Sequence, residues 1–442
     1  MRRTYCTYCT YWWVAALLLV ALGVAHCAPA QTTPPALAES PGAAAAANAE
    51  RVVPAPTWEY QFPPGSVGST VRLSGDFRYL ATNTEVRSYH LPGEPDAVRT
   101  EGENAVYFFD LAERRLLWKE VFPEGSPAFV CGVSASGELV GVEIGGDTPE
   151  PGMRLYDGGG RFLVGNAPVE ADWVTEGRAE LIMRPPEAGE APLSEELTAA
   201  LAAVGIRFSA AFRGRRGFQY LYRGGPGLVA YLDPDGTTCW EYELPPSTSW
   251  GAGLIGSWGT LSQSPDREYA LVGIAPTDVP EPYETRRILL FGRSQGLLWT
   301  KDLDMRLGGK TARRAYSVPL ELSSGAASVV VERGPSPAVV QVFDEQGREK
   351  SSVAFGAVTP GPPSVSPNGR YWAAPLTRFV QGPGADDKGW TEGIHVFDCD
   401  TGEVVWRSPT MATASPVIVT DAGGVIAISH RDRALSVFDP PI

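Results

Sequence analysis

One unit of sequence returns six times along the 442-residue chain. It consists of an apolar strand, an acidic or glycine-rich tight turn and a second strand that often carries tryptophan, followed by proline, glycine or serine. The copies begin at Ala105, Met153, Leu228, Ile288, Val339 and Ile394, and their turns start at Asp110, Asp157, Asp233, Gly292, Asp344 and Asp398. A repeat of this kind predicts a fold built from stacked copies of one supersecondary unit.

A second pattern lies between the copies: an apolar strand, a turn of serine, aspartate or glycine, and an alternating strand. It reads VRLSGDFRYLAT from Val71, LSQSPDREYALVGIA from Leu261 and SVSPNGRYWAAPL from Ser364, and it returns from Val130 and Ile418. Two hairpins per unit give four antiparallel strands, which we denote a to d. Four short strands in each repeat predict the blade of a β-propeller, in which neighbouring blades bury each other's apolar faces.

The two ends of the chain carry complementary halves of one hairpin. The chain ends in LSVFDPPI, a third strand without a fourth, and TWEYQFPPGS from Thr57 is a fourth strand without a third. Pairing residues 57–64 with residues 435–442 adds a seventh unit. The sequence therefore predicts an all-β fold: a seven-bladed β-propeller of four-stranded antiparallel blades, closed by pairing its N- and C-terminal strands, with one short helical insertion.

Composition and charge narrow the classes of protein. The 49 glycines and 39 prolines exclude a coiled coil, a helical solenoid and a multi-span membrane protein, because each of these needs long helices. The formal charge of −14 repels phosphate backbones and anionic lipids, so nucleic acid is not a predicted partner. Cys6 and Cys9 form a C-x-x-C, but no second pair or histidine cluster stands at zinc-site spacing, and no metal site is predicted.

The first 30 residues resemble a secretory signal peptide. Two arginines precede an apolar run at residues 11–25, and the small residues Ala28-Pro29-Ala30 follow it. Two alternatives stay open: lipidation at Cys27 and an uncleaved membrane anchor. The sequence therefore predicts a protein that is secreted or located in the periplasm or cell envelope. Contact with a membrane is expected only through an N-terminal tether.

Residues 31–56 are rich in alanine and proline and lack a periodic apolar face, which predicts a disordered linker. The domain prediction is therefore a signal peptide at residues 1–30, this linker, and the propeller at residues 57–442.

The unit at residues 398–406, DCDTGEVVW, resembles the D-x-x-T-G-x-x-x-W repeat of the pyrroloquinoline-quinone-type propeller superfamily. That superfamily includes quinoprotein dehydrogenases and a non-enzymatic outer-membrane assembly lipoprotein. The turns SPDREYALVG and SPNGRYWAA are similar to those of WD-repeat-like bacterial propellers. Quinoprotein dehydrogenases carry vicinal cysteines beneath the quinone, whereas Cys131, Cys239 and Cys399 are far apart in the sequence. No cofactor is predicted.

Catalytic constellations are not evident in the sequence. His90, His395 and His430 are scattered, and Gly309-Lys310-Thr311 lacks the first glycine of a phosphate-binding loop, because Asp304 stands there. The turns at Asp233 and Asp398 suit a calcium loop or a tight hairpin, and we favour the hairpin because the same position in other units holds residues that could not bind calcium. The recurring tryptophans, Trp58, Trp118, Trp240, Trp299 and Trp406, are interpreted as packing of the outer strand.

These observations favour a non-catalytic scaffold that binds a protein or a small molecule. The alternative is a propeller enzyme, a hydrolase, a lyase or a quinoprotein-type oxidoreductase, with its site at the mouth of the central channel. The prediction names no catalytic residue and leaves enzymatic activity open.

The connections between strands differ in length. In the predicted propeller the d–a and b–c connections emerge on one face, and the a–b and c–d turns on the other. The a–b and c–d turns are short, whereas the predicted b–c loops are long at residues 82–104, 184–217, 275–287 and 377–393. Binding residues concentrate on loops held by a rigid scaffold, so the b–c face is the predicted working face. Insertional drift is the alternative explanation.

The b–c connection of the third unit is the most distinctive. Residues 195–204 are predicted to form a helix, with Ser194 as its N-cap and Gly205 as its terminator. Arginines interleaved with aromatic residues follow it, either as a solvated basic surface or as a partner site. The predicted partner-binding residues are Arg213, Arg215, Arg216, Trp250 and Trp390. The protein is predicted to be a monomer.

Overall fold

The structure is a computed structural model of the chain. It describes residues 52–53, 55–91, 94–123, 125–134, 136–145, 152–165, 169–175, 178–183, 217–222, 227–232, 238–245, 261–274, 278–279, 285–304, 320–333, 338–356, 358–379, 389–409, 414–429 and 433–440. Contacts divide the chain into two units, Met1–Ala49 and Glu50–Ile442, and every described residue lies in the second. Among the helices of these residues, none has the length and apolar character needed to span a membrane.

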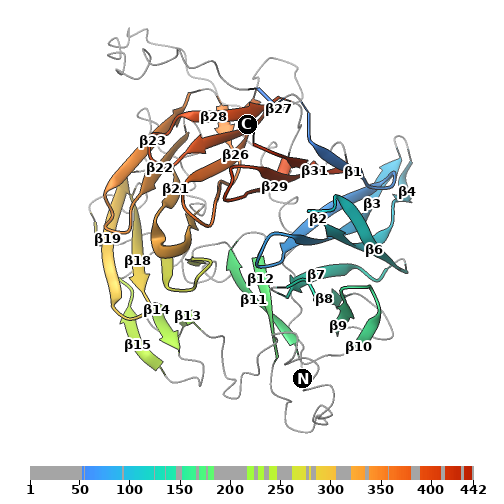
Figure 1. The fold of residues 1–442 in the computed structure, drawn as a ribbon, viewed down its shortest axis with the longest axis horizontal. Helices are drawn as coiled ribbons and strands as arrows, with labels where there is room; N and C mark the ends of the chain where they lie inside the picture. Colours follow the sequence, from blue (N-terminus) through green and yellow to red (C-terminus); the bar gives the residue numbers. More distant parts are fainter. Residues whose placement is uncertain are drawn as a thin grey trace. The chain divides into compact units, whose positions relative to one another are not determined.

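Antiparallel sheets, each built mostly from strands that are consecutive in the chain, make up this unit (Figure 1). The sheet β2-β3-β5-β6, with β4 attached to β3, comprises β2 (Ser66–Leu73), β3 (Tyr79–Leu91), β4 (Glu94–Glu101), β5 (Asn104–Asp110) and β6 (Arg115–Phe122). The next sheet comprises β7 (Ala128–Val133), β8 (Leu139–Ile144), β9 (Gly152–Asp157) and β10 (Phe162–Gly165).

Three further sheets repeat this plan. Two have four strands each: β16 (Leu261–Gln263), β17 (Tyr269–Ile274), β18 (Thr285–Gly292) and β19 (Gly296–Asp304); and β20 (Leu320–Leu322), β21 (Val329–Arg333), β22 (Ala338–Phe343) and β23 (Glu349–Phe355). The third comprises β24 (Val358–Pro360), β25 (Ser364–Val365), β26 (Tyr371–Phe379), β27 (Gly389–Asp398) and β28 (Val404–Ser408). The 3-10 turn η2 (Ser324–Ala326) follows β20. The predicted four-stranded antiparallel unit is confirmed in these sheets.

The third unit differs from the prediction of a single four-stranded blade. The strands β11 (Val169–Thr175) and β12 (Arg178–Met183) form a separate hairpin, and a three-stranded sheet contains β13 (Gly217–Tyr222), β14 (Gly227–Leu232) and β15 (Thr238–Glu243). β13 begins at Gly217, where the predicted b–c loop of residues 184–217 ends, and it pairs with the whole length of β14. This pairing occupies the edge of β14 that β12 was expected to use. The predicted helix at residues 195–204 lies outside the described residues.

The two ends of the propeller chain share one sheet. It has the order β1-β31-β30-β29 and comprises β1 (Trp58–Gln61), β29 (Ala414–Val419), β30 (Val425–Ser429) and β31 (Ala434–Phe438). Trp58 is the Cα partner of Val437, and Gln61 is the partner of Ala434. The backbone N–H of Phe62 extends the pairing by donating to the carbonyl of Arg433 at 2.8 Å. The predicted pairing of the terminal segments is confirmed over these residues.

Contacts of the N-terminal segment begin before β1. Val52 forms a parallel bridge with Arg407, whose carbonyl accepts a hydrogen bond from the N–H of Val53 at 2.8 Å. The side chain of Val53 packs against the core between β26–β28 and β29–β31. Residues ahead of Thr57, the predicted start of the propeller, therefore touch the outer strand β28.

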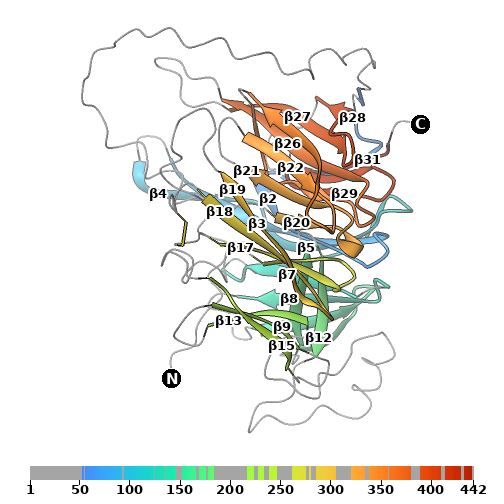
Figure 2. The ribbon, with the colours of Figure 1, turned by 90° about the vertical axis from the view of Figure 1, so that its left-hand side faces the viewer.

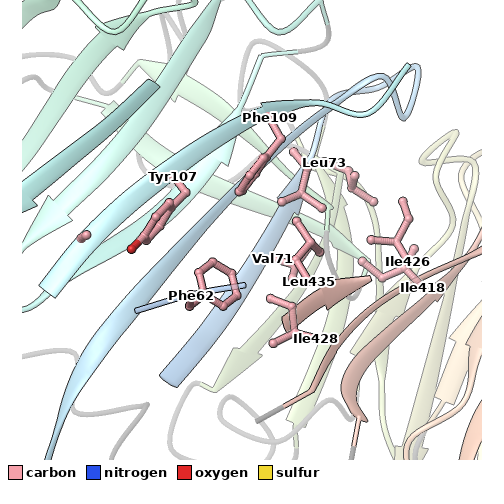
Figure 3. Packing of buried hydrophobic residues seen from close by; sticks show 11 residues of the cluster. Phe62, Val71, Leu73, Tyr107, Phe109, Ile418, Ile426, Ile428 and Leu435 are labelled. Carbon is pink, nitrogen blue, oxygen red and sulfur yellow. The ribbon is translucent and has the colours of Figure 1, made fainter. Parts of the chain in front are cut away.

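Apolar clusters join neighbouring sheets. In one of them Phe62, Val71, Tyr107 and Leu435 meet, so that side chains from β2, β5 and the terminal sheet point toward one another (Figure 3). Similar clusters join β2–β6 to β7–β10, β14–β15 to β16–β19, β16–β19 to β20–β23, β20–β23 to β26–β27, and β26–β28 to β29–β31. Because a central strand packs on both sides, all seven residues of β5 are buried.

The recurring tryptophans belong to this packing. The indole Nε1 atoms of Trp240, Trp299 and Trp406 donate to the carbonyls of Arg293, Glu345 and Gly423, at 2.8, 3.0 and 2.9 Å. Each acceptor lies in a turn of the next sheet along the chain. The Trp118 side chain lies against Gly160 in the next sheet without an indole hydrogen bond of this kind, and Trp58 contacts Phe109 edge-to-face at 5.7 Å. The interpretation of these tryptophans as packing residues is confirmed.

Candidate interaction face

The a–b and c–d turns share one face of the sheets, which we call the turn face, and their polar groups bond mainly within the turns and to neighbouring turns. In the c–d turn after β27, Asp398 Oδ1 accepts the backbone N–H groups of Asp400 and Thr401 at 2.9 and 3.0 Å. In the a–b turn after β16, Ser264 Oγ donates to Asp266 Oδ1 at 2.5 Å and accepts the N–H of Tyr269 at 3.0 Å. Asp398 is therefore a hairpin-turn residue, whereas Asp233 lies outside the described residues.

The opposite face carries the d–a and b–c connections, and we call it the hairpin face. On it β3 and β4 continue past β2 as a two-stranded hairpin, arm 1, in which residues 87–91 pair with residues 94–101 (Figure 2). A second hairpin, arm 6, pairs residues 377–379 of β26 with residues 389–391 of β27, and β24 pairs with β26 along its other edge. The sheet β1-β31-β30-β29 shares one apolar core with the sheet that carries arm 6 and another with the sheet that carries arm 1.

These arms correct the prediction that residues 82–104 and 377–393 are loops. Residues 82–91 and 94–101 of the first segment and residues 377–379 and 389–393 of the second are strand, because they include residues that favour β-structure. In arm 1 the sequence VRSYHL precedes Pro92-Gly93, and its residues 87–91 pair with residues 94–101 of β4. The hairpin face therefore carries regular, hydrogen-bonded projections.

The base of arm 1 is fixed by close contact between two glycines. Gly65, in the d–a connection, and Gly102, at the end of arm 1, both have positive φ, at +79° and +98°. A Cβ atom on Gly102 would lie 2.5 Å from the carbonyl carbon of Gly65, so neither position accepts a side chain without a shift of backbone. On the outgoing strand Asn104 Oδ1 accepts the N–H of Val86 at 3.2 Å.

An ionic cluster lies beside this base. The carboxylate of Glu103 accepts hydrogen bonds from the Tyr107 hydroxyl and from Lys119 Nζ, the latter at 2.5 Å. The Lys119 ammonium also lies 5.3 Å from the centre of the Tyr107 ring, and Phe62 packs on that ring edge-to-face. Burial, followed by the bond to Glu103, raises the pKa of Tyr107. The phenol therefore stays protonated at neutral pH and donates its hydrogen bond to Glu103.

A second ionic cluster holds part of the b–c connection before β18. Arg287 donates to Asp302 at 2.7 and 2.8 Å and to Asp278 at 2.8 and 3.0 Å. The hydrogen bond to Asp302 is the largest cause that raises the pKa of Arg287, and the bond from Arg287 lowers the pKa of Asp278. One guanidinium thus joins the connection to the outer strand β19.

Four of the five predicted partner-binding residues, Arg213, Arg215, Arg216 and Trp250, lie outside the described residues. Trp390 lies in arm 6, where its Cα partner is Arg378. Sequence reasoning missed Glu103, Tyr107 and Lys119. A signal for the first of them was present: Gly102-Glu103-Asn104 separates two strand-like stretches, which marks a tight return to the sheet.

Neither of the two buried cysteines carries an activated thiol. Burial raises the pKa of Cys131 and of Cys399 to about 12, and Cys239 is exposed. Within the described part of the chain, no group of three or more His, Cys, Asp and Glu side chains is arranged to hold a metal ion.

Comparison with known proteins adds likeness in fold. No protein-family model matches the sequence, and no curated protein matches it. Among solved structures, the chain is similar to the Cps50 (Swd1) β-propeller domain of Myceliophteria thermophila, at 11% identity over 86% of this chain and 97% of that one, with a TM-score of 0.43. It is similar to Raptor of Chaetomium thermophilum, at 11% identity over 89% of this chain and a TM-score of 0.45, but it spans only 29% of Raptor.

A further similar structure is the Dos1 propeller, at 8% identity over 87% of this chain and 95% of that one, with a TM-score of 0.39. The assignment as a β-propeller rests on the four-stranded sheets and the cores that join them.

Proposed function

We propose that the sheets form a closed, seven-bladed propeller. The β11–β12 hairpin supports this count, because β12 contacts β7 and β11 contacts β16, the first strands of the sheets before and after it. The hairpin thus occupies the place of an inner strand, and with β13–β15 it makes up the third blade. The shared β1–β31 sheet and the cluster around Phe62 join the last blade to the first.

We further propose that this propeller is a monomeric, non-catalytic scaffold whose hairpin face binds a protein partner. The contrast between its faces carries the proposal. Aspartate and serine groups of the turn face bond mainly to the backbone of their own hairpins and to adjacent turns. On the hairpin face, by contrast, both strands of arm 1 and the β27 strand of arm 6 have an edge that pairs with no other described strand, while β24 covers the β26 edge of arm 6. Strand edges and aromatic or arginine anchors are common means of holding a protein.

The partner site in this proposal includes Trp390 of arm 6, together with Arg213, Arg215, Arg216 and Trp250 of the third-blade connections. Planar guanidinium groups recognise carboxylates in two-point contacts, and indoles provide large apolar anchors. The partner is therefore expected to present an acidic stretch next to apolar side chains.

Affinity capture with three immobilised proteins tests this site: the wild type, the triple variant R213A/R215A/R216A, and the turn-face variant N368A/D421A. The last removes a pair in which the Asn368 N–H donates to Asp421 Oδ1 at 2.7 Å. We expect a partner, quantified by mass spectrometry, to be lost from the triple variant and kept by the turn-face variant. The reverse pattern would place the site on the turn face.

The location of the protein is a separate proposal, supported by the signal-peptide-like residues 1–30. We propose export across a membrane, followed by release or by tethering through the N-terminus. Sequencing the N-terminus of the protein from fractionated cells of its source tests this. A mature end near residue 31 in the exported fraction supports cleavage, and an intact Met1 in the cytosolic fraction refutes export.

A further inference from the structure

Glu103 makes bonds to four strands of its sheet, β2, β3, β5 and β6. Its backbone N–H donates to Ser66 Oγ of β2 at 3.1 Å, and its carbonyl accepts the hydroxyl of Thr84 in β3 at 2.9 Å. Its carboxylate accepts from Tyr107 in β5 and from Lys119 in β6. These four partners together hold Glu103 in place relative to β2, β3, β5 and β6.

Glu103 also stands at the point where arm 1 rejoins the sheet. Gly102, which precedes it, is in contact with Gly65, and Asn104, which follows it, binds the outgoing strand at Val86. Beyond Val86 the pairing of β3 with β2 and β5 has ended, and β4 is its partner. The direction of the arm therefore depends on the contacts at its base.

The cluster links the arm to the closure of the ring. Tyr107 packs against Tyr60 and Phe62, with ring centres 5.8 and 5.1 Å apart, and both belong to the N-terminal segment that completes the β1–β31 sheet. The carboxylate of Glu103 thus bonds to a side chain that is itself held by the closing segment. Arm and closure share one set of contacts.

We propose that Glu103 is a positioning residue that holds arm 1 in the direction needed for binding on the hairpin face, through its bonds to Ser66, Thr84, Tyr107 and Lys119. The binding role rests on the proposed function, whereas the positioning of the arm does not. Glu103 acts through the arm, and its side chain is only one-fifth exposed. A partner that engages arm 1 would sense this residue without touching it.

Hydrogen exchange on the full-length protein without a partner tests the positioning. In E103Q, which loses the charge that both donors use, amides at residues 87–101 should exchange about tenfold faster, because strong charge-assisted bonds at the arm's base are weakened. T84V removes one bond to the Glu103 carbonyl while keeping side-chain volume, and it should increase exchange by a smaller factor. Amides of β20–β23 should not change in either variant.

The matched control is E120Q, because Glu120 lies next to Lys119 on β6, is exposed, and has a side chain that makes no hydrogen bond or ion pair with any described residue. Unchanged exchange at residues 87–101 in folded E103Q and T84V, or an equal increase in E120Q, overturns the positioning role. If E103Q fails to fold, T84V decides by the same comparison. Loss of arm protection in E103Q together with failure to find any hairpin-face partner would leave the positioning role intact and refute the proposed function.

Discussion

Replacing Phe62 by alanine should destabilise the protein strongly, although the residue lies in a short segment at the start of the propeller. Phe62 is 3% exposed and belongs to the cluster between the terminal sheet and β2–β5. Its ring meets those of Tyr60 and Tyr107 edge-to-face, at 5.6 and 5.1 Å. Loss of a buried phenylalanine forfeits about 1.5–3 kcal/mol of transfer free energy, and the cavity brings the total to about 3–5 kcal/mol.

The control is Phe162→Ala, which removes the same side chain from β10, where it is 51% exposed. Because half of that ring already meets water, its loss should cost less than about 1.5 kcal/mol. Equilibrium unfolding in guanidinium chloride, followed by tryptophan fluorescence, measures both changes from the transition midpoints at constant slope. Equal, small shifts for the two variants would mean that the N-terminal segment is not docked, and the reasoning on closure would fail.

Two further predictions concern titratable groups. A maleimide at pH 7 should label Cys239 and leave Cys131 and Cys399 unmodified until denaturant is added, because both buried thiols have a pKa of about 12. Peptide mapping locates the label, and a label on Cys131 or Cys399 in the native protein would contradict their burial. Acid should destabilise the fold below about pH 4. Burial opposes ionisation of Asp344, but the hydrogen bonds from Arg348 outweigh burial and lower the pKa of Asp344 in the folded protein. The stability that this carboxylate contributes is therefore present above its pKa in the unfolded chain and is lost as the pH falls through its pKa in the folded protein. Asp344→Asn should reduce that pH dependence, as followed by thermal melts from pH 3 to 6, and an unchanged dependence would refute the assignment.

The sequence was sufficient to predict the sheets wherever turn chemistry punctuates alternating strands. Ser264-Pro265-Asp266 and Asp398 to Gly402 form the turns that their residues favour, and the strands on either side follow. The pairing of the chain ends was predictable as well, because Trp58-Glu59-Tyr60 copies the fourth strand of another unit. These features depend on residues close together in the sequence or on a repeated pattern.

The features that were missed depend on contacts between distant residues. The edge of β14 is taken by β13 in place of β12, a competition between two strands that no local pattern decides. In the Glu103 cluster the partners Ser66, Thr84 and Lys119 lie up to 37 residues away in the sequence. Polar residues are common in β-strands, so nothing in the sequence marks these three as members of one cluster. Arm 1 lies where the spacing of the repeats predicts a long b–c loop, although several of its residues favour strand.

A footprint of the captured partner on this protein tests the central proposal, that the hairpin face binds a protein, most directly. Hydrogen exchange of the full-length protein would be compared with and without the purified partner at saturating concentration. We expect protection at residues 87–101 of arm 1, at residues 377–379 and 389–391 of arm 6, and in the third-blade connections at residues 205–226 and 246–256. Protection confined to the turns at residues 74–79, 264–269 and 398–403, with both arms unchanged, would contradict the proposal.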